Sequence, residues 1–257
     1  MKKENRKKYT ILCLMAHPDD AEILSGGTLA ALRNKGCRVV IASMTPGQAG
    51  SMVVGAEEIA SIRRLEGAAA AAVIGAAYYC MESEDLYISY DKPTLNRVIN
   101  LFREVQPDIV ITASPQDYML DHEISSNLAQ SACMAATIPN LKVGEFPILE
   151  KVPHLYYADA VQGTDRFGKP VESDFFIDIS VYMETKIEML IQHKSQCDWL
   201  RSISKVDEFV EMMRSFSARN GAKVGVAYAE GYRQHLGFSY PHDNSLANLL
   251  KEYFIQK

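Results

Sequence analysis

Apolar runs alternate with helix-like segments along most of the chain, and this alternation restricts the fold more than any other feature. Continuous apolar runs of strand length are typical of strands that are covered on both faces. The expected strands are Tyr9–Ala16, Cys37–Met44, Ala76–Met81, Pro107–Ala113, His154–Ala160 and Phe175–Ile179. The expected helices are Ser25–Lys35, Ala56–Ile74, Lys92–Val105, Ile124–Thr137, Val181–Arg201, Val206–Asn220 and Ser245–Phe254. This alternation predicts an α/β fold with a doubly wound, mostly parallel sheet flanked by helices.

Length and composition are those of an ordinary globular protein. The chain has 257 residues, of which 47% are hydrophobic and 23% charged. We expect a single domain over residues 1–257, with residues 1–8 frayed. The net charge of −5 gives no basic surface for nucleic acid, so nucleic acid is not expected as a partner.

The amino-terminal sequence does not predict an exported or membrane-bound protein. The basic segment Met1–Lys8 precedes an apolar run, Ile11–Ala16, that is too short for a spanning helix and lacks a cleavage pattern after it. The five cysteines are scattered and form no CxxC pair. We therefore expect a cytoplasmic protein whose cysteines are buried thiols.

Two clusters of polar residues follow the first and fourth expected strands. His17-Pro18-Asp19-Asp20 comes directly after the first strand, and Asp121-His122 comes shortly after the fourth. In the common strand order 3-2-1-4-5 these two strands are neighbours, and ligands bind outside their carboxyl ends. Alone, His-Pro-Asp-Asp is also compatible with a turn and a solvated carboxylate, but the pairing of the two clusters favours a metal centre.

The residue types of the two clusters indicate a catalytic metal. We assign His17, Asp20 and His122 as ligands, a set that suits Zn²⁺ and also accepts Fe²⁺ or Mn²⁺. Three protein ligands leave one position open for water, whose pKa zinc lowers to roughly 7. Asp19 then remains as a neighbouring base. These roles predict a hydrolytic amidase or esterase.

The same residues resemble the signature of a known family. Ala16–Glu22 with Gly26-Gly27-Thr28 looks like the motif of the LmbE/PIG-L family of zinc-dependent N-acetylglucosaminyl deacetylases. Arg63–Glu66 resembles the family's arginine-bearing helix, and Asp117–His122 resembles its second metal motif. The resemblance is looser at Phe175–Ile179 and Tyr228–Gly231.

The resemblance implies a Rossmann-like fold that removes acetyl from an N-acetylated sugar derivative. It also implies that His17, Asp20 and His122 hold zinc, that Asp19 is the base, and that Arg63 contacts the substrate. From the residues alone, Arg63 fits equally well as a solvated helix residue. Neither the sequence nor the resemblance identifies the sugar, and both leave the oligomeric state open, a homo-oligomer included.

One position departs from the family pattern. Where many members have His-Pro-Asp-His, this chain has Met119-Leu120-Asp121-His122, and Met119 cannot donate a hydrogen bond to an oxyanion. Tyr118 and His235 are candidate replacement donors, and Asp121 is a candidate to orient a ligand. The alternative to a hydrolase is a metal-containing sugar-binding protein with weak or lost activity.

Overall fold

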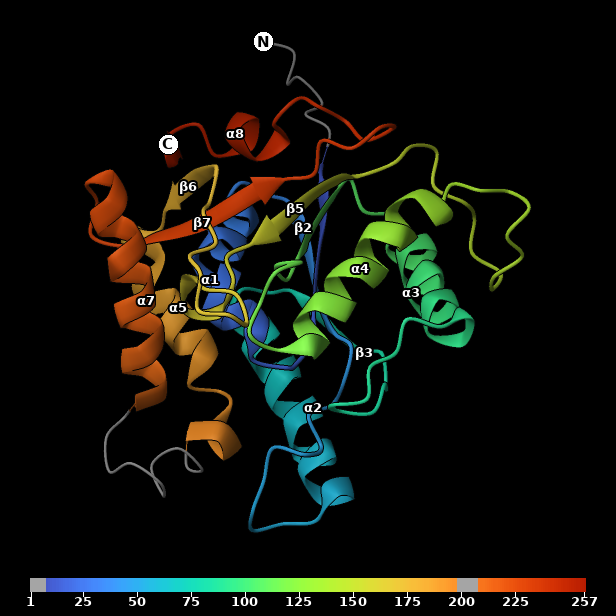
Figure 1. Cartoon of the computed structure of the whole chain (residues 1–257), viewed down its shortest axis with the longest axis horizontal. Helices are drawn as coiled ribbons and strands as arrows, with labels where there is room; N and C mark the ends of the chain where they lie inside the picture. Colours follow the sequence, from blue (N-terminus) through green and yellow to red (C-terminus); the bar gives the residue numbers. More distant parts are fainter. Residues whose placement is uncertain (1–7, 198–207) are drawn as a thin grey trace.

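The computed structural model describes residues 8–197 and 208–257. In this part of the chain, eight strands form one mixed sheet in the order β3-β2-β1-β4-β5-β7-β6-β8, flanked by helices (Figure 1). The strands are β1 Thr10–Met15, β2 Arg38–Ser43, β3 Ala77–Cys80, β4 Ile109–Thr112, β5 His154–Ala158, β6 Phe175–Asp178, β7 Ala229–Gln234 and β8 Phe254–Gln256. The predicted α/β fold is confirmed. The expected fraying of residues 1–8 falls, apart from Lys8, outside the described residues.

The first five strands are parallel and lie in the predicted order 3-2-1-4-5. β1 pairs with β2 on one side and with β4 on the other, and β4 pairs with β5. β7 pairs antiparallel with both β5 and β6, and β6 pairs antiparallel with β8. The winding therefore reverses between β1 and β4, which places the crevice at the carboxyl ends of these two strands.

Helices cover both faces of the sheet, as Figure 1 shows with α3 and α4 on one side and α1, α5 and α7 on the other. Alternate residues of β1 face opposite layers: Ile11 and Cys13 pack toward α1 and α5, whereas Leu12 and Leu14 pack toward α3 and α4. The described helices are α1 Asp20–Asn34, α2 Ala56–Val73, α3 Lys92–Val105, α4 Leu120–Ala135, α5 Met183–Leu190, α7 Glu208–Val224 and α8 Ser245–Leu249, with short 3-10 turns η1 Val161–Gly163 and η2 Ser180–Tyr182.

Two helices begin earlier than the sequence predicts, and both corrections concern the functional residues. α1 begins at Asp20 instead of Ser25, and α4 begins at Leu120 instead of Ile124. The turns that were expected to be loops are therefore the first turns of helices. They carry buried polar side chains, which hydrophobic periodicity does not detect.

The carboxyl-terminal third differs more from the prediction. α5 ends at Leu190, so His193 lies after this helix and not within it. The predicted last helix, Ser245–Phe254, is α8 followed by a turn and the edge strand β8. The predicted loop Gly231–Asp243 begins inside β7.

None of the described helices is both long and apolar enough to cross a membrane.

Candidate metal centre

Parallel strands bring the candidate site residues to one edge of the sheet. His17 lies two residues beyond the end of β1, and Asp20 is the first residue of α1. Asp121 and His122 lie in the first turn of α4, which follows β4. The structure thus brings His17 and His122, which are 105 positions apart, into direct contact.

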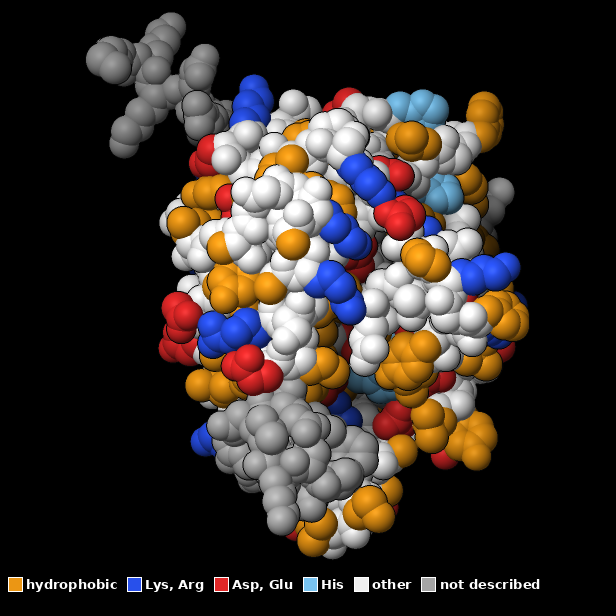
Figure 2. Space-filling view, turned by 60° about the vertical axis from the view of Figure 1, so that its left-hand side comes forward, with side chains coloured by type: hydrophobic (Ala, Val, Ile, Leu, Met, Phe, Trp, Pro, Cys, Tyr) orange, Lys and Arg blue, Asp and Glu red, His pale blue; other side chains and the backbone are white. Residues whose placement is uncertain are grey.

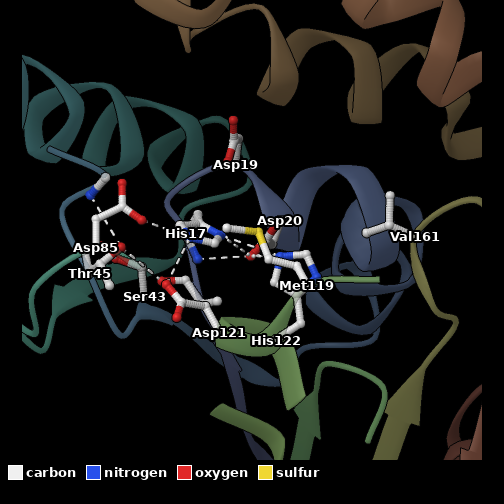
Figure 3. A network of polar contacts seen from close by, with 12 residues as sticks. His17, Asp19, Asp20, Ser43, Thr45, Asp85, Met119, Asp121, His122 and Val161 are labelled. Carbon is white, nitrogen blue, oxygen red and sulfur yellow. Dashed lines mark hydrogen bonds and ion pairs between the residues drawn. The ribbon is translucent and has the colours of Figure 1, made fainter. Parts of the chain in front are cut away.

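Three side chains converge with the geometry of a metal site. His17 Nδ1 lies 3.3 Å from Asp20 Oδ2 and 3.3 Å from His122 Nε2, and His122 Nε2 lies 3.5 Å from Asp20 Oδ2 (Figure 3). Ligand atoms at ~2.1 Å from a tetrahedral ion lie ~3.4 Å apart, so these distances fit three corners of a zinc tetrahedron. His17, Asp20 and His122 therefore form a group that can hold a metal ion.

The electrostatics around these side chains favour a cation. Burial opposes protonation of His17, but Asp20, Asp121 and Asp85 outweigh it and raise the pKa of His17 well above its ordinary value. Burial also opposes ionisation of Asp20, yet the two histidines lower the pKa of its carboxyl. The surrounding carboxylates therefore favour positive charge at these side chains, and a divalent ion would be one source of it.

Further carboxylates contact the outer nitrogens of the two rings. Asp85 Oδ1 lies 3.1 Å and Asp121 Oδ2 3.6 Å from His17 Nε2, and Asp117 Oδ1 lies 3.0 Å from His122 Nδ1. The sequence reasoning missed Asp85 and gave Asp117 no role of its own. Asp85 follows β3, and the only sequence signal for it was its place after a strand that ends at this edge.

Asp19 and Arg63 form a buried ion pair beside this group. Arg63 Nη2 donates to Asp19 Oδ1 at 3.1 Å, and Nη1 donates to the carbonyl oxygen of Gly47 at 3.2 Å. Figure 3 shows the Asp19 carboxylate turned away from Asp20 and His122. Gly47 has a φ of +69°, and a Cβ there would lie 2.2 Å from Arg63 Nη1, so only glycine leaves room for the guanidinium. Arg63 is thus buried, and the solvated alternative is wrong.

The triangle of His17, Asp20 and His122 and the pair of Asp19 and Arg63 line one cavity of about 610 Å³. Figure 2 shows a recess with a histidine side chain at its base and hydrophobic side chains along its rim. The cavity is lined by His17, Asp19, Asp20, Ile23, Ala49, Gly50, Arg63, Asp85, Leu86, Tyr118, Met119, His122, Val161, Gln162, Thr164, Gln196, Phe209 and Met212. Its volume suits a small molecule, and the loop 46–55 contributes to its wall.

The two candidate replacement donors differ in position. Tyr118 lines the cavity next to Met119, and its ring packs edge-on against His122, with centroids 5.6 Å apart. The structure does not bring His235 to the cavity: its Nδ1 lies 2.8 Å from the hydroxyl of Tyr157. His154 and His193 are also elsewhere, 2.9 Å from Asp243 and 3.5 Å from Glu22 respectively.

Comparison with known proteins finds one matching family model and several similar enzymes. Residues 12–133 match the PIG-L family, described as GlcNAc-PI de-N-acetylase. The chain is 29% identical over 230 residues to a diacetylchitobiose deacetylase from Thermococcus kodakarensis. This alignment covers 87% of this chain and 82% of that protein. It is 27% identical over 190 residues to a 4-oxalmesaconate hydratase from Pseudomonas putida, over 71% of this chain and 72% of that protein.

A solved structure shows the same architecture. The N,N′-diacetylchitobiose deacetylase from Pyrococcus horikoshii, in complex with its inhibitor MPG, superposes with a TM-score of 0.75 at 25% identity. The match covers 92% of this chain and 87% of that chain. The family match spans both halves of the candidate metal centre, from β1 to α4.

Proposed function

From the match of residues 12–133 to the PIG-L family, and from the geometry beside them, we propose that this protein is a metal-dependent hydrolase. Its proposed reaction removes an N-acyl group, acetyl in the first instance, from an amino-sugar derivative. The observation that carries the proposal is the triangle of His17, Asp20 and His122, whose edges of 3.3 to 3.5 Å fit a tetrahedral ion.

In this proposal His17, Asp20 and His122 would hold zinc beside the cavity that they line. When bound there, a zinc ion supplies Lewis-acid chemistry: it polarises a carbonyl group and acidifies water. The donor set of two imidazoles and one carboxylate also accepts Fe²⁺ or Mn²⁺. The neighbouring carboxylates of Asp19, Asp85, Asp117 and Asp121 outnumber the single guanidinium, which suits a divalent cation.

Asp19 is the proposed general base. It lines the cavity and is not part of the metal-binding triangle, so its carboxylate is available to accept a proton from the attacking water. In the structure it accepts a hydrogen bond from Arg63. The ion pair with Arg63 holds this carboxylate in place, and the remaining N–H groups of Arg63 are suited to bind an oxygen of the substrate.

Met119 sets a limit on the proposed reaction. It lines the cavity where a hydrogen-bond donor to the oxyanion is expected, and a missing donor can lower turnover by ~10²–10³. A second candidate, the addition of water to a carbon–carbon double bond, is supported by the similarity to the hydratase from Pseudomonas putida. Both reactions use the same metal site and Asp19.

A direct assay distinguishes these functions. The zinc-loaded protein is incubated with N-acetylglucosamine and N,N′-diacetylchitobiose, and released acetate is measured. In parallel, loss of ultraviolet absorbance reports hydration of unsaturated dicarboxylates. Acetate release that is abolished in Asp19→Asn supports the deacylase, and acetate release that survives this substitution contradicts its mechanism. Hydration without acetate release supports the second candidate, and zinc binding without either reaction favours a sugar-binding protein.

A further inference from the structure

We propose that Asp85 and Asp117 are positioning residues that connect the metal centre to the walls of the substrate cavity. Each carboxylate holds one metal-binding histidine ring with one oxygen and fixes one cavity loop with the other. The inference rests on the proposed metal site but not on the identity of the substrate. It assigns a role to two aspartates outside the metal-binding triangle.

The two nitrogens of His17 face different partners. Nδ1 points to Asp20 and His122, whereas Nε2 lies 3.1 Å from Asp85 Oδ1 (Figure 3). An imidazole that gives the lone pair of Nδ1 to a metal carries its proton on Nε2. That N–H donates to Asp85, which fixes both the tautomer and the orientation of the ring.

His122 repeats the arrangement with its nitrogens exchanged. Nε2 points to the triangle, and Nδ1 lies 3.0 Å from Asp117 Oδ1. Here the proton belongs on Nδ1 and donates to Asp117. The two rings thus require opposite tautomers, and each required proton has a buried carboxylate at hydrogen-bonding distance.

The second oxygen of each carboxylate accepts a hydrogen bond from a backbone amide in the cavity wall. Asp85 Oδ2 accepts from the N–H of Ala49 at 3.1 Å, and Asp117 Oδ2 accepts from the N–H of Val161 at 2.9 Å. Ala49 lies in the loop after β2, and Val161 begins η1 after β5; both line the cavity. A change in either ring is therefore transmitted to one wall of the cavity.

His17, Asp85 and Asp121 also form a group that could hold an ion of its own. Two ions, one on each nitrogen of His17, would require the ring to lose both protons. Asp121 Oδ2 is also engaged by the N–H of Leu86 at 2.8 Å. These contacts indicate that Asp85 and Asp121 orient the His17 ring and do not bind a second ion. The proposal therefore predicts one zinc ion per chain.

The test compares Asp85→Asn and Asp117→Asn with the unaltered protein. Asparagine keeps the size of the side chain but offers only one accepting oxygen, so it cannot serve the ring and the loop together. We expect the zinc dissociation constant, measured by competition with a chromophoric chelator, to rise about 10- to 100-fold in each variant. Asp243→Asn is the matched control, because it makes the same substitution in an Asp–His contact of 2.9 Å, to His154, away from the metal centre; its zinc dissociation constant should not change.

Hydrogen exchange tests the connection to the cavity walls. Asp85→Asn should accelerate amide exchange at Ala49 but not at Val161, and Asp117→Asn should do the reverse. A variant that only loosens the fold would accelerate both. In the zinc-bound unaltered protein, long-range ¹H–¹⁵N NMR should find the proton of His17 on Nε2 and that of His122 on Nδ1. This last measurement needs no variant, so it decides the question even if a variant does not fold.

The outcomes separate this inference from the proposed function. Zinc dissociation constants that do not change in either variant, a proton on His17 Nδ1 or on His122 Nε2, or two zinc ions per chain would overturn the positioning role while leaving a metal-dependent hydrolase intact. Failure of the unaltered protein to bind zinc would overturn both. The proposal is supported if each variant binds zinc more weakly and shows faster amide hydrogen exchange only at its own loop residue, Ala49 for Asp85→Asn and Val161 for Asp117→Asn.

Discussion

Asp19 and Asp20 are adjacent in sequence but face different partners. Asp20 is the first residue of α1 and points to the two histidines, whereas Asp19 is the N-cap and pairs with Arg63. Successive helical residues project about 100° apart around the helix axis. The start of α1 therefore separates a proposed metal ligand from a proposed base at the smallest possible distance along the chain.

This separation gives a prediction for Asp19. Asp19→Asn should lower turnover by about 10²–10⁴, the contribution of a general base, while the zinc content stays the same. Asp20→Asn should lower the zinc content itself. Turnover on an N-acetylated sugar and zinc content by elemental analysis are measured on the same samples. Loss of zinc from Asp19→Asn would show that the two roles are assigned wrongly.

His17 and His122 predict how the stabilisation by zinc depends on pH. Burial opposes their protonation, but nearby carboxylates outweigh it and raise the pKa of both. In the metal-free protein, protonation of these two rings stabilises the folded state. This contribution is fully present below the ordinary histidine pKa of about 6.5 and is lost as the pH rises through the raised pKa values. Zinc competes with these protons, so it should raise the melting temperature more at pH 8 than at pH 6. An equal rise at both pH values would argue against zinc on these rings.

At the scale of elements, a buried ion pair joins α1, α5 and β7. Lys186 Nζ of α5 lies 2.6 Å from Glu230 Oε1 of β7, and the same carboxylate accepts from the amides of Gly27 and Thr28 in α1. Lys186 is 0% exposed and Glu230 3%. Glu230 thus holds α1, the helix that carries Asp20, against the antiparallel part of the sheet.

Lys186→Met should therefore destabilise the fold strongly. It leaves the Glu230 carboxylate buried without its cation, which typically costs about 3–5 kcal/mol of unfolding free energy. Urea unfolding followed by circular dichroism measures the change. Lys35→Met, which removes the exposed pair with Glu252, is the control and should change stability little. A small effect of Lys186→Met would contradict the stabilising role of this ion pair.

The elements also show what the sequence could and could not predict. Apolar runs located β1 to β6, and the predicted helices Ala56–Ile74 and Lys92–Val105 agree with α2 and α3 to within one residue. The first turns of α1 and α4 were missed, since their buried positions carry Asp20, Glu22, Asp121 and His122 instead of apolar residues. Hydrophobic spacing therefore failed to predict these helices at the positions of the candidate site residues.

At the scale of the whole molecule, the parallel half of the sheet assembles the site. β1 delivers His17, the loop after β2 delivers Ala49, β3 is followed by Asp85, β4 by Asp117 to His122, and β5 by Val161. The predicted strand order was sufficient to bring the two proposed metal-binding segments together. It could not place Asp85, because one aspartate after a short strand has no distinguishing pattern, nor could it exclude His235, whose position depends on the antiparallel half.

The central claim is that the fold completes one metal centre from two distant segments. Zinc content per chain tests it most directly, in the unaltered protein, in His17→Ala and in His122→Ala, with His242→Ala as a control for exposed histidines. The account predicts one zinc ion per chain in the unaltered protein and in the control, and almost none in either of the other variants. Zinc content that is unchanged in His17→Ala or in His122→Ala would contradict it.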